Sequence, residues 1–246
     1  MMLKKVLTAP LFLLVQNSFA QQYYNDSAIV SGAAEHAKLY YNQKRGNEAA
    51  IYNGVLHHGY PSYIEGIAYF LADKWELGRI IYDNILYEDI LMKYDLLTDQ
   101  VVVVSKERAS VPLSLYSPRV KEFSFAGLKF VNSNEVSGMA SLKEGFYQEL
   151  VKGRANAYCR SEKIIWERIN GDRLQRSFEE KKKYYIVKDN RSHLITKKKD
   201  LLNALKDQKK VVQDTLKNKK MKFRKNMEEL IIAATESYNK SGREKL

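Results

Sequence analysis

The sequence predicts an α+β protein in which an antiparallel β meander, barrel-like or strongly curled, is followed by a C-terminal pair of amphipathic helices. Three observations predict this fold class. From Gly66 to about Thr196 apolar and polar residues alternate, which is the period of a strand. Turn residues interrupt this stretch at intervals of roughly 8–12 residues. After Lys199 the apolar residues recur with the period of a helix.

The predicted strands follow one another along the chain. They cover Gly66–Phe70, Trp75–Tyr82, Ile85–Tyr94, Val101–Val104, Ser110–Tyr116, Val120–Phe125, Lys129–Asn132, Gly145–Lys152, Arg154–Glu167, Lys183–Lys188 and Ser192–Thr196. The pairs Asp83-Asn84 and Asp189-Asn190 are typical of two-residue hairpin turns, and Lys152-Gly153 separates a third pair of strands. The sequence therefore favours hairpins in chain order.

Two helices are predicted between residues 199 and 240. The apolar stripe of the first is formed by Leu201, Leu205, Val212 and Leu216. The stripe of the second is formed by Met227, Leu230, Ile231, Ala234 and Tyr238. Because amphipathic helices bury their apolar face, we expect this pair to pack on the open side of the sheet.

The first twenty residues predict a secretory signal peptide that is cleaved after Ala20. Lys4 and Lys5 precede the apolar segment 6–15, and Ser18 and Ala20 place small residues at the −3 and −1 positions. The apolar segment is shorter than the roughly 20 residues of a membrane-spanning helix. A buried N-terminal helix is the alternative. We expect a periplasmic or secreted mature protein.

Beyond the signal peptide, residues 21–65 are predicted to form an N-terminal segment with a short helix and turns. Residues 66–246 are predicted to form one domain, with the helices packed on the meander. The formal net charge of +12 is concentrated in residues 151–246, which contain 27 Lys and Arg against 13 Asp and Glu. Export argues against nucleic acid as the partner of this basic region.

The sequence contains none of the common catalytic or nucleotide-binding motifs: no G-x-S-x-G, H-E-x-x-H, C-x-x-C, Walker loop or G-x-G-x-x-G. Cys159 is the only cysteine, so an internal disulfide is impossible, and it is predicted to be a small apolar packing residue. His57 and His58 are adjacent and would point in opposite directions on a strand, which disfavours a metal site. No catalytic, cofactor or metal residue is assigned.

Four acidic residues, Glu88, Asp89, Asp95 and Asp99, lie around one predicted hairpin. Paired carboxylates are the catalytic groups of glycosidases. Asp95 and Asp99, however, occupy positions where aspartate stabilises a turn through its own backbone, and this interpretation is favoured.

Two surface patches are predicted. Seventeen tyrosines are present, many of them on predicted strands, and a binding cleft is predicted around Trp75, Tyr82, Tyr87 and Tyr94. Cross-strand packing is the competing interpretation. A second patch, formed by Lys209, Lys210, Lys217 and Lys220, is predicted to meet anionic lipid head groups, and a solvated helix face is its alternative.

Several motifs are similar to those of exported Gram-negative proteins without an assigned activity. They are Gly78–Asn84 (GRIIYDN), Met92–Val103 (MKYDLLTDQVVV), Gly145–Leu150 (GFYQEL), Tyr184-Tyr185, Lys198–Leu202 (KKDLL) and Lys220–Lys225 (K-x-x-F-x-K). The resemblance covers most of the predicted mature chain. It implies export and a single structural unit, and it assigns no functional residue.

The sequence favours a non-enzymatic exported binding or accessory protein, whose partner is an envelope component or another exported protein. The alternatives are a hydrolase acting on envelope or dietary polymers and an envelope-surface protein that uses its basic helices, with peripheral membrane contact. An outer-membrane barrel fits the polar C-terminal helices poorly. A binding protein predicts a tyrosine-lined cleft without paired catalytic groups. An enzyme predicts a pocket that joins at least two of Glu88, Asp89, Asp95, His57 and His58.

Overall fold

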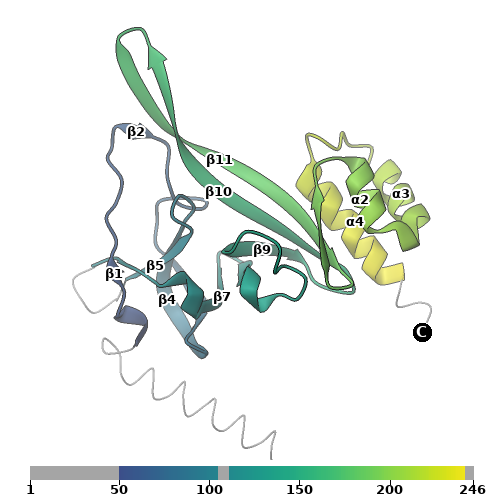
Figure 1. Cartoon of the computed structure of the whole chain (residues 1–246), viewed down its shortest axis with the longest axis horizontal. Coiled ribbons are helices and arrows are strands. Elements are labelled where there is room, and N and C mark those ends of the chain that lie inside the picture. The colour runs from purple at the N-terminus through teal and green to yellow at the C-terminus, as the bar shows by residue number, and fades with distance from the viewer. Residues whose placement is uncertain (1–49, 105–110, 242–246) are drawn as a thin grey trace, which may run out of the picture. The chain divides into compact units, whose positions relative to one another are not determined.

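The computed structural model describes residues 50–104 and 111–241, all within the unit Lys38–Leu246 (Figure 1). The predicted signal peptide and the short helix predicted within residues 21–65 lie outside the described residues. Cleavage after Ala20 and the domain limits therefore stay predictions.

Within the described residues, twelve strands form one sheet. They are β1 (Val55–Leu56), β2 (Ile64–Glu65), β3 (Glu76–Tyr82), β4 (Ile85–Asp95), β5 (Gln100–Val104), β6 (Leu113–Ser114), β7 (Val120–Phe125), β8 (Leu128–Asn132), β9 (Phe146–Val151), β10 (Asn156–Asn170), β11 (Arg173–Lys188) and β12 (Arg191–Ile195). Short 3₁₀ turns are η2 (Ala50–Tyr52), η3 (Ser117–Arg119) and η4 (Ser133–Glu135).

The strand order is β1-β6-β5-β4-β3-β7-β8-β9-β10-β11-β12, and β2 adds to β11 in parallel. All other pairs are antiparallel. Two meanders, β3 to β6 and β7 to β12, meet where β7 pairs with β3 rather than with β6. The predicted α+β class is confirmed. The described sheet is not closed, so the predicted closure into a barrel is not confirmed.

The predicted hairpin turns are confirmed by the backbone. Asp83 and Asn84 join β3 to β4, and Asp189 and Asn190 join β11 to β12; all four have positive φ, between 50° and 62°. Asp and Asn tolerate this left-handed conformation, and consecutive positive φ angles match the twist of a hairpin. Local turn chemistry therefore sets the register of both hairpins.

Three strand predictions are wrong in extent. Of the predicted strand 110–116, whose first residue lies outside the described residues, only Leu113–Ser114 is a strand. The segment Gly66–Phe70 makes only one isolated bridge, between Tyr69 and Asp95, because Lys163 Nζ donates hydrogen bonds to the carbonyl oxygens of Ile67 and Tyr69. The predicted strand 183–188 begins ten residues earlier, at Arg173. Many residues of this strand are charged, so apolar and polar residues do not alternate clearly in its sequence. Many of these charged residues pair with residues of β10.

The first predicted C-terminal helix is also corrected. It is divided into α2 (Lys198–Ala204), the 3₁₀ turn η5 (Lys206–Gln208) and α3 (Lys209–Asn218), because Leu205 leaves helical geometry at the end of α2. The second is one helix, α4 (Met227–Ser241). In the described part of the chain, no helix is both long and apolar enough to cross a membrane.

Both helical stripes pack inward as predicted, and Met227 is the one stripe residue that is only partly buried. They pack with β9 to β12 into one apolar cluster that contains Leu201, Leu205, Val212, Leu216, Leu230, Ile231, Ala234 and Tyr238. A separate aromatic cluster packs on the part of the sheet between β3 and β9. Its ring centroids lie 4.8–6.3 Å apart, and the rings belong to Phe70, Tyr94, Phe123, Phe130 and Phe146. A third cluster contains Val131, Met139, Tyr147, Tyr158, Tyr185 and Val187. One sheet therefore supports three cores.

Candidate functional site

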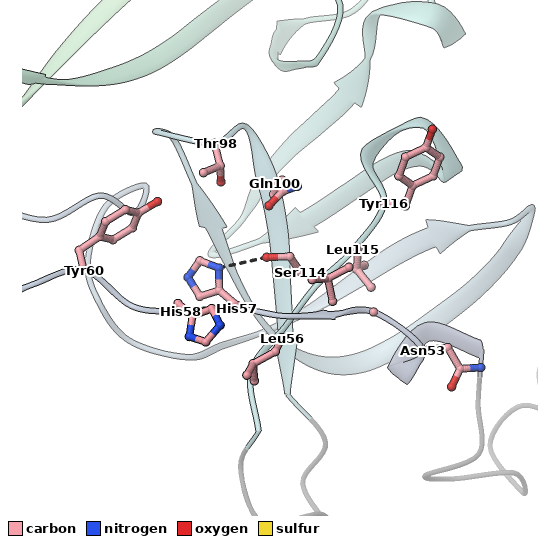
Figure 2. A pocket seen from close by; sticks show the side chains of 12 residues that line it. Asn53, Leu56, His57, His58, Tyr60, Thr98, Gln100, Ser114, Leu115 and Tyr116 are labelled. Carbon is pink, nitrogen blue, oxygen red and sulfur yellow. Dashed lines mark hydrogen bonds between the residues drawn. The ribbon is translucent and has the colours of Figure 1, made fainter.

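A pocket of about 510 Å³ lies at the β1 end of the sheet (Figure 2). Its wall is formed by six consecutive residues, 53–58, together with residues of β5, β6 and the turn before β5. The lining residues are Asn53, Gly54, Val55, Leu56, His57, His58, Tyr60, Thr98, Gln100, Ser114, Leu115 and Tyr116.

The pairing of β1 with β6 brings the two halves of this pocket together. Val55 lies opposite Ser114, and Leu56 lies opposite Leu113. Gly54 is required for this approach, since a Cβ atom there would lie 2.7 Å from the carbonyl oxygen of Ser114. The predicted Asn53-Gly54 turn is thus a site of close backbone contact at the pocket wall.

His57 is the buried polar centre of the pocket. Its Nδ1 lies 3.0 Å from the Ser114 hydroxyl (Figure 2), and its Nε2 lies 2.9 Å from the Tyr69 hydroxyl. Burial lowers the pKa of His57, against the opposing effect of the Asp95 carboxylate. A neutral imidazole has one donor and one acceptor nitrogen, and the two hydroxyls can satisfy both.

Asp95 lies behind His57 and stabilises the β4–β5 turn. Its Oδ1 accepts hydrogen bonds from the backbone N–H groups of Leu97 and Thr98, at 2.9 and 3.3 Å. Its Oδ2 accepts one from the Tyr60 hydroxyl at 2.6 Å. The predicted structural role of Asp95 is confirmed. Burial and this hydrogen bond raise the pKa of Tyr60, so its hydroxyl stays protonated as the donor.

The contacts from Ser114 to His57 to Asp95 resemble the order of a hydrolase triad, but their geometry does not support one. His57 Nε2 lies 4.0 Å from Asp95 Oδ2 and forms its hydrogen bond with Tyr69 instead. Ser114 is buried in β6 between β1 and β5, whereas a serine nucleophile must be exposed to its substrate. The arrangement serves to hold the pocket wall rigid.

The pocket lining contains no Asp, Glu, Lys or Arg among the described residues. Its apolar part includes Leu56 and Tyr116, whose side chains are 50% and 63% exposed. Its polar part carries amide and hydroxyl groups, notably on Gln100, Thr98 and Tyr60. Such a lining suits an uncharged ligand that has an apolar face and several hydrogen-bonding groups.

The residues of the predicted aromatic binding patch do not form an exposed surface. Tyr82, Tyr87 and Tyr94 are all buried in the aromatic core, and Tyr94 donates a hydrogen bond to Asp99 Oδ1 at 2.6 Å. Trp75 is partly buried, and Lys93 Nζ lies 4.4 Å from the centroid of its ring. The alternating tyrosines serve cross-strand packing, so the prediction of a cleft is corrected.

The acidic residues of the first hairpin do not converge at the pocket. Glu88 forms an exposed ion pair with Arg79, at 3.0 Å. Asp89 has a positive φ of 55° at an irregularity in the β3–β4 pairing. The turn-stabilising role predicted for Asp99 is corrected, because its carboxylate accepts hydrogen bonds from Tyr94 and Arg160, at 2.6 and 2.9 Å. His57 and His58 both line this pocket, so two of the five residues expected in an enzyme pocket meet here, but none of the three carboxylates of that set is among the lining residues.

The predicted lysine patch is exposed. Lys209, Lys210 and Lys217 lie on α3, within about 100° of one another at 3.6 residues per turn, and Lys220 follows the helix. The structure thus agrees with the exposed basic face on which the envelope-surface hypothesis depends. Lipid contact by this face stays a prediction.

The metal and thiol predictions can be compared with the described residues. None of their His, Cys, Asp and Glu side chains form a group of three or more that could hold a metal ion. Cys159 is fully buried, and burial raises the pKa of its thiol to about 12, which disfavours the reactive thiolate.

The sequence did not identify the pocket residues Tyr60, Gln100, Ser114 and Tyr116. The available signal was local: the turn residues Asn53-Gly54 and Gly59-Tyr60-Pro61 flank the pocket wall. No local pattern indicates that Val55 and Leu56 pair with residues 59 and 57 positions away.

The burial of His57 predicts a pH effect on stability. The unfolded chain binds a proton at His57 near pH 6.5, whereas the folded protein binds it only at lower pH. The free energy of unfolding should therefore fall as the pH decreases through 6.5, and His57→Gln should reduce this slope. Urea unfolding between pH 5 and 8 measures it. Equal slopes in the wild type and the variant would contradict the assignment.

Comparison of the whole chain with protein-family models, with curated proteins and with solved structures gave no match.

Proposed function

We propose that the protein is an exported, non-enzymatic binding protein whose pocket at β1 and β6 takes a neutral carbohydrate. The observation that carries the proposal is the composition of the pocket. Its lining combines exposed apolar and aromatic side chains with amide and hydroxyl groups, and it contains no Asp, Glu, Lys or Arg. Sugars present apolar C–H faces and many hydroxyls, which match aromatic rings and planar amides.

The rigidity of the pocket supports binding rather than catalysis. The imidazole of His57 is held between Ser114 and Tyr69, and the Asp95 carboxylate between the turn amides and Tyr60. Groups that are fully hydrogen-bonded within the wall leave no general base beside an activated nucleophile. Preorganisation of this kind lowers the cost of ordering a site around a ligand.

Export is proposed from the sequence. Lys4 and Lys5, the apolar segment 6–15 and the small residues before Gln21 are typical of a cleaved signal peptide. The motifs similar to exported Gram-negative proteins agree with this, and we propose a periplasmic or secreted location. We also propose that the sheet is strongly curled, as its strand periodicity predicts. The partner is then an envelope component or a ligand met outside the cytoplasm.

Calorimetric titration with maltose, cellobiose and chitobiose tests the proposal. We expect one of these neutral disaccharides to bind, and Tyr116→Ala to weaken its affinity by about tenfold through the loss of ring contact. Tyr63→Ala is the matched control, since Tyr63 is 65% exposed, compared with 63% for Tyr116, and does not line the pocket.

Two outcomes would contradict the proposal. Binding that is equally weakened by both tyrosine variants would place the ligand outside the pocket. Release of monosaccharide during the titration, abolished by Ser114→Ala, would show that the protein is a hydrolase.

A further inference from the structure

The distal half of the hairpin formed by β10 and β11 is an exposed arm. β9 pairs with β10 only near its start, at residues 157–159, and β12 pairs with β11 only at residues 184–188. Between these paired residues and the tip, the only other described strand that pairs with the hairpin is the short strand β2, which pairs with β11 (Figure 1). Every side chain that the structure describes from residue 165 to 175 is exposed.

This arm carries large apolar side chains at its end. Ile169 is 77% exposed and lies directly opposite Leu174, which is 52% exposed. Trp166 is 50% exposed. Because alternate residues of a strand face opposite sides, Ile169 and Leu174 lie on one face and Trp166 on the other. Apolar residues on both faces of one tip are typical of an interaction site rather than of a solvated hairpin.

The charged side chains at the tip are mostly basic. Glu167 forms an ion pair with Arg176 at 2.7 Å. Arg168, Asp172 and Arg173 are exposed, and none of them forms an ion pair with a described residue, so the tip carries two unpaired arginines and one unpaired aspartate. The two strands together contain nine Lys and Arg against four Asp and Glu. This excess of positive charge is complementary to an anionic surface.

We propose that the hairpin tip binds the surface of an anionic lipid bilayer. Ile169 and Leu174 enter the boundary between head groups and acyl chains, and Trp166 lies at the head-group level, where its amphipathic ring is favoured. The guanidinium groups of Arg168 and Arg173 bind lipid phosphates while their aliphatic stems follow the apolar side chains. This surface is distinct from the pocket and from the lysine patch on α3.

Vesicle binding tests the proposal, and tryptophan fluorescence localises it. The chain has two tryptophans, so Trp75→Phe leaves Trp166 as the only indole. We expect this protein to co-sediment with vesicles of phosphatidylcholine and phosphatidylglycerol, and the Trp166 emission to shift to the blue. Binding should weaken as salt rises, because ions screen the arginine–phosphate attraction. It should be much weaker on pure phosphatidylcholine.

Substitutions at the tip separate insertion from general charge attraction. Ile169→Ser with Leu174→Ser should weaken vesicle binding by tenfold or more, since each apolar side chain contributes roughly one order of magnitude when buried. Leu174→Ser alone is matched by Leu77→Ser on β3, because both leucines are 52% exposed. Leu77→Ser should bind vesicles as the wild type does.

Three results would overturn the proposal. The first is the absence of vesicle binding with an unchanged Trp166 spectrum. The second is binding that survives the tip substitutions and disappears when Lys209, Lys210, Lys217 and Lys220 are changed to Gln, which would assign it to the helix patch. The third is a dimer in solution, disrupted by the tip substitutions and without affinity for vesicles, which would make a second copy the occupant.

Discussion

Asp95→Ala is expected to lower the free energy of unfolding by about 3 kcal/mol. The substitution leaves the backbone N–H groups of Leu97 and Thr98 and the hydroxyl of Tyr60 without their acceptor. Each polar group that loses its partner in a buried position costs about 1–3 kcal/mol, so the three groups together cost at least about 3 kcal/mol, and the exposure of Thr98 keeps the sum near this lower limit. Urea unfolding at pH 7 measures the change.

Asp95→Asn is the matched control for this prediction. The asparagine side-chain oxygen still accepts from Leu97 and Thr98, so the turn is retained and the expected loss is about 1 kcal/mol. Disaccharide affinity should fall in Asp95→Ala because Tyr60 lines the pocket. Equal stability losses in the two variants would show that turn capping is not the function of this carboxylate.

Replacing Arg160 by methionine is expected to cost about 3 kcal/mol, since it removes the buried partner of two ion pairs whose carboxylates are 24% and 22% exposed. The side chain is 2% exposed. Its guanidinium donates to Asp99 at 2.9 Å and to Glu162 at 3.1 Å, and it lies 5.1 Å from the ring centroid of Tyr147. It thereby connects β10 with the β4–β5 turn, close to the pocket. Thermal unfolding followed by circular dichroism measures the loss.

Arg160→Lys distinguishes geometry from charge. Lysine keeps the positive charge but lacks the planar fork that binds two carboxylates at once, so about half of the loss is expected to remain. A lysine variant as stable as the wild type would show that charge alone is sufficient at this position. A methionine variant as stable as the wild type would show that the ion pairs do not contribute to folding.

Sequence periodicity predicted most strands because local chemistry decides them. Asp83-Asn84 and Asp189-Asn190 adopt the left-handed conformation that their residue types allow, so the hairpins follow directly. Gly66–Phe70 is an unbroken apolar run, which also suits a strand, but a long-range contact with Lys163 takes two of its carbonyl groups out of the ladder. The period alone cannot distinguish these cases.

The candidate site was less predictable than the fold. Tyrosines on strands are equally suited to packing and to binding, and Tyr82, Tyr87 and Tyr94 are used for packing. The pocket instead arises where Val55 pairs with Ser114. Neither short strand shows an alternation long enough to specify this register, so only the three-dimensional pairing reveals the site.

The shortness of β1 has a consequence for the order of assembly. Its two residues are exposed, and β1 is the last strand of the described sheet on that side. The pairing of β1 with β6 closes a long loop and gains few contacts. We therefore expect β1 to dock only after the hairpins of β3, β4 and β5 have formed. The hydrogen bonds of His57 to Ser114 and Tyr69 then hold this late segment in place. Occupancy of the pocket would therefore further stabilise the part of the sheet that docks last.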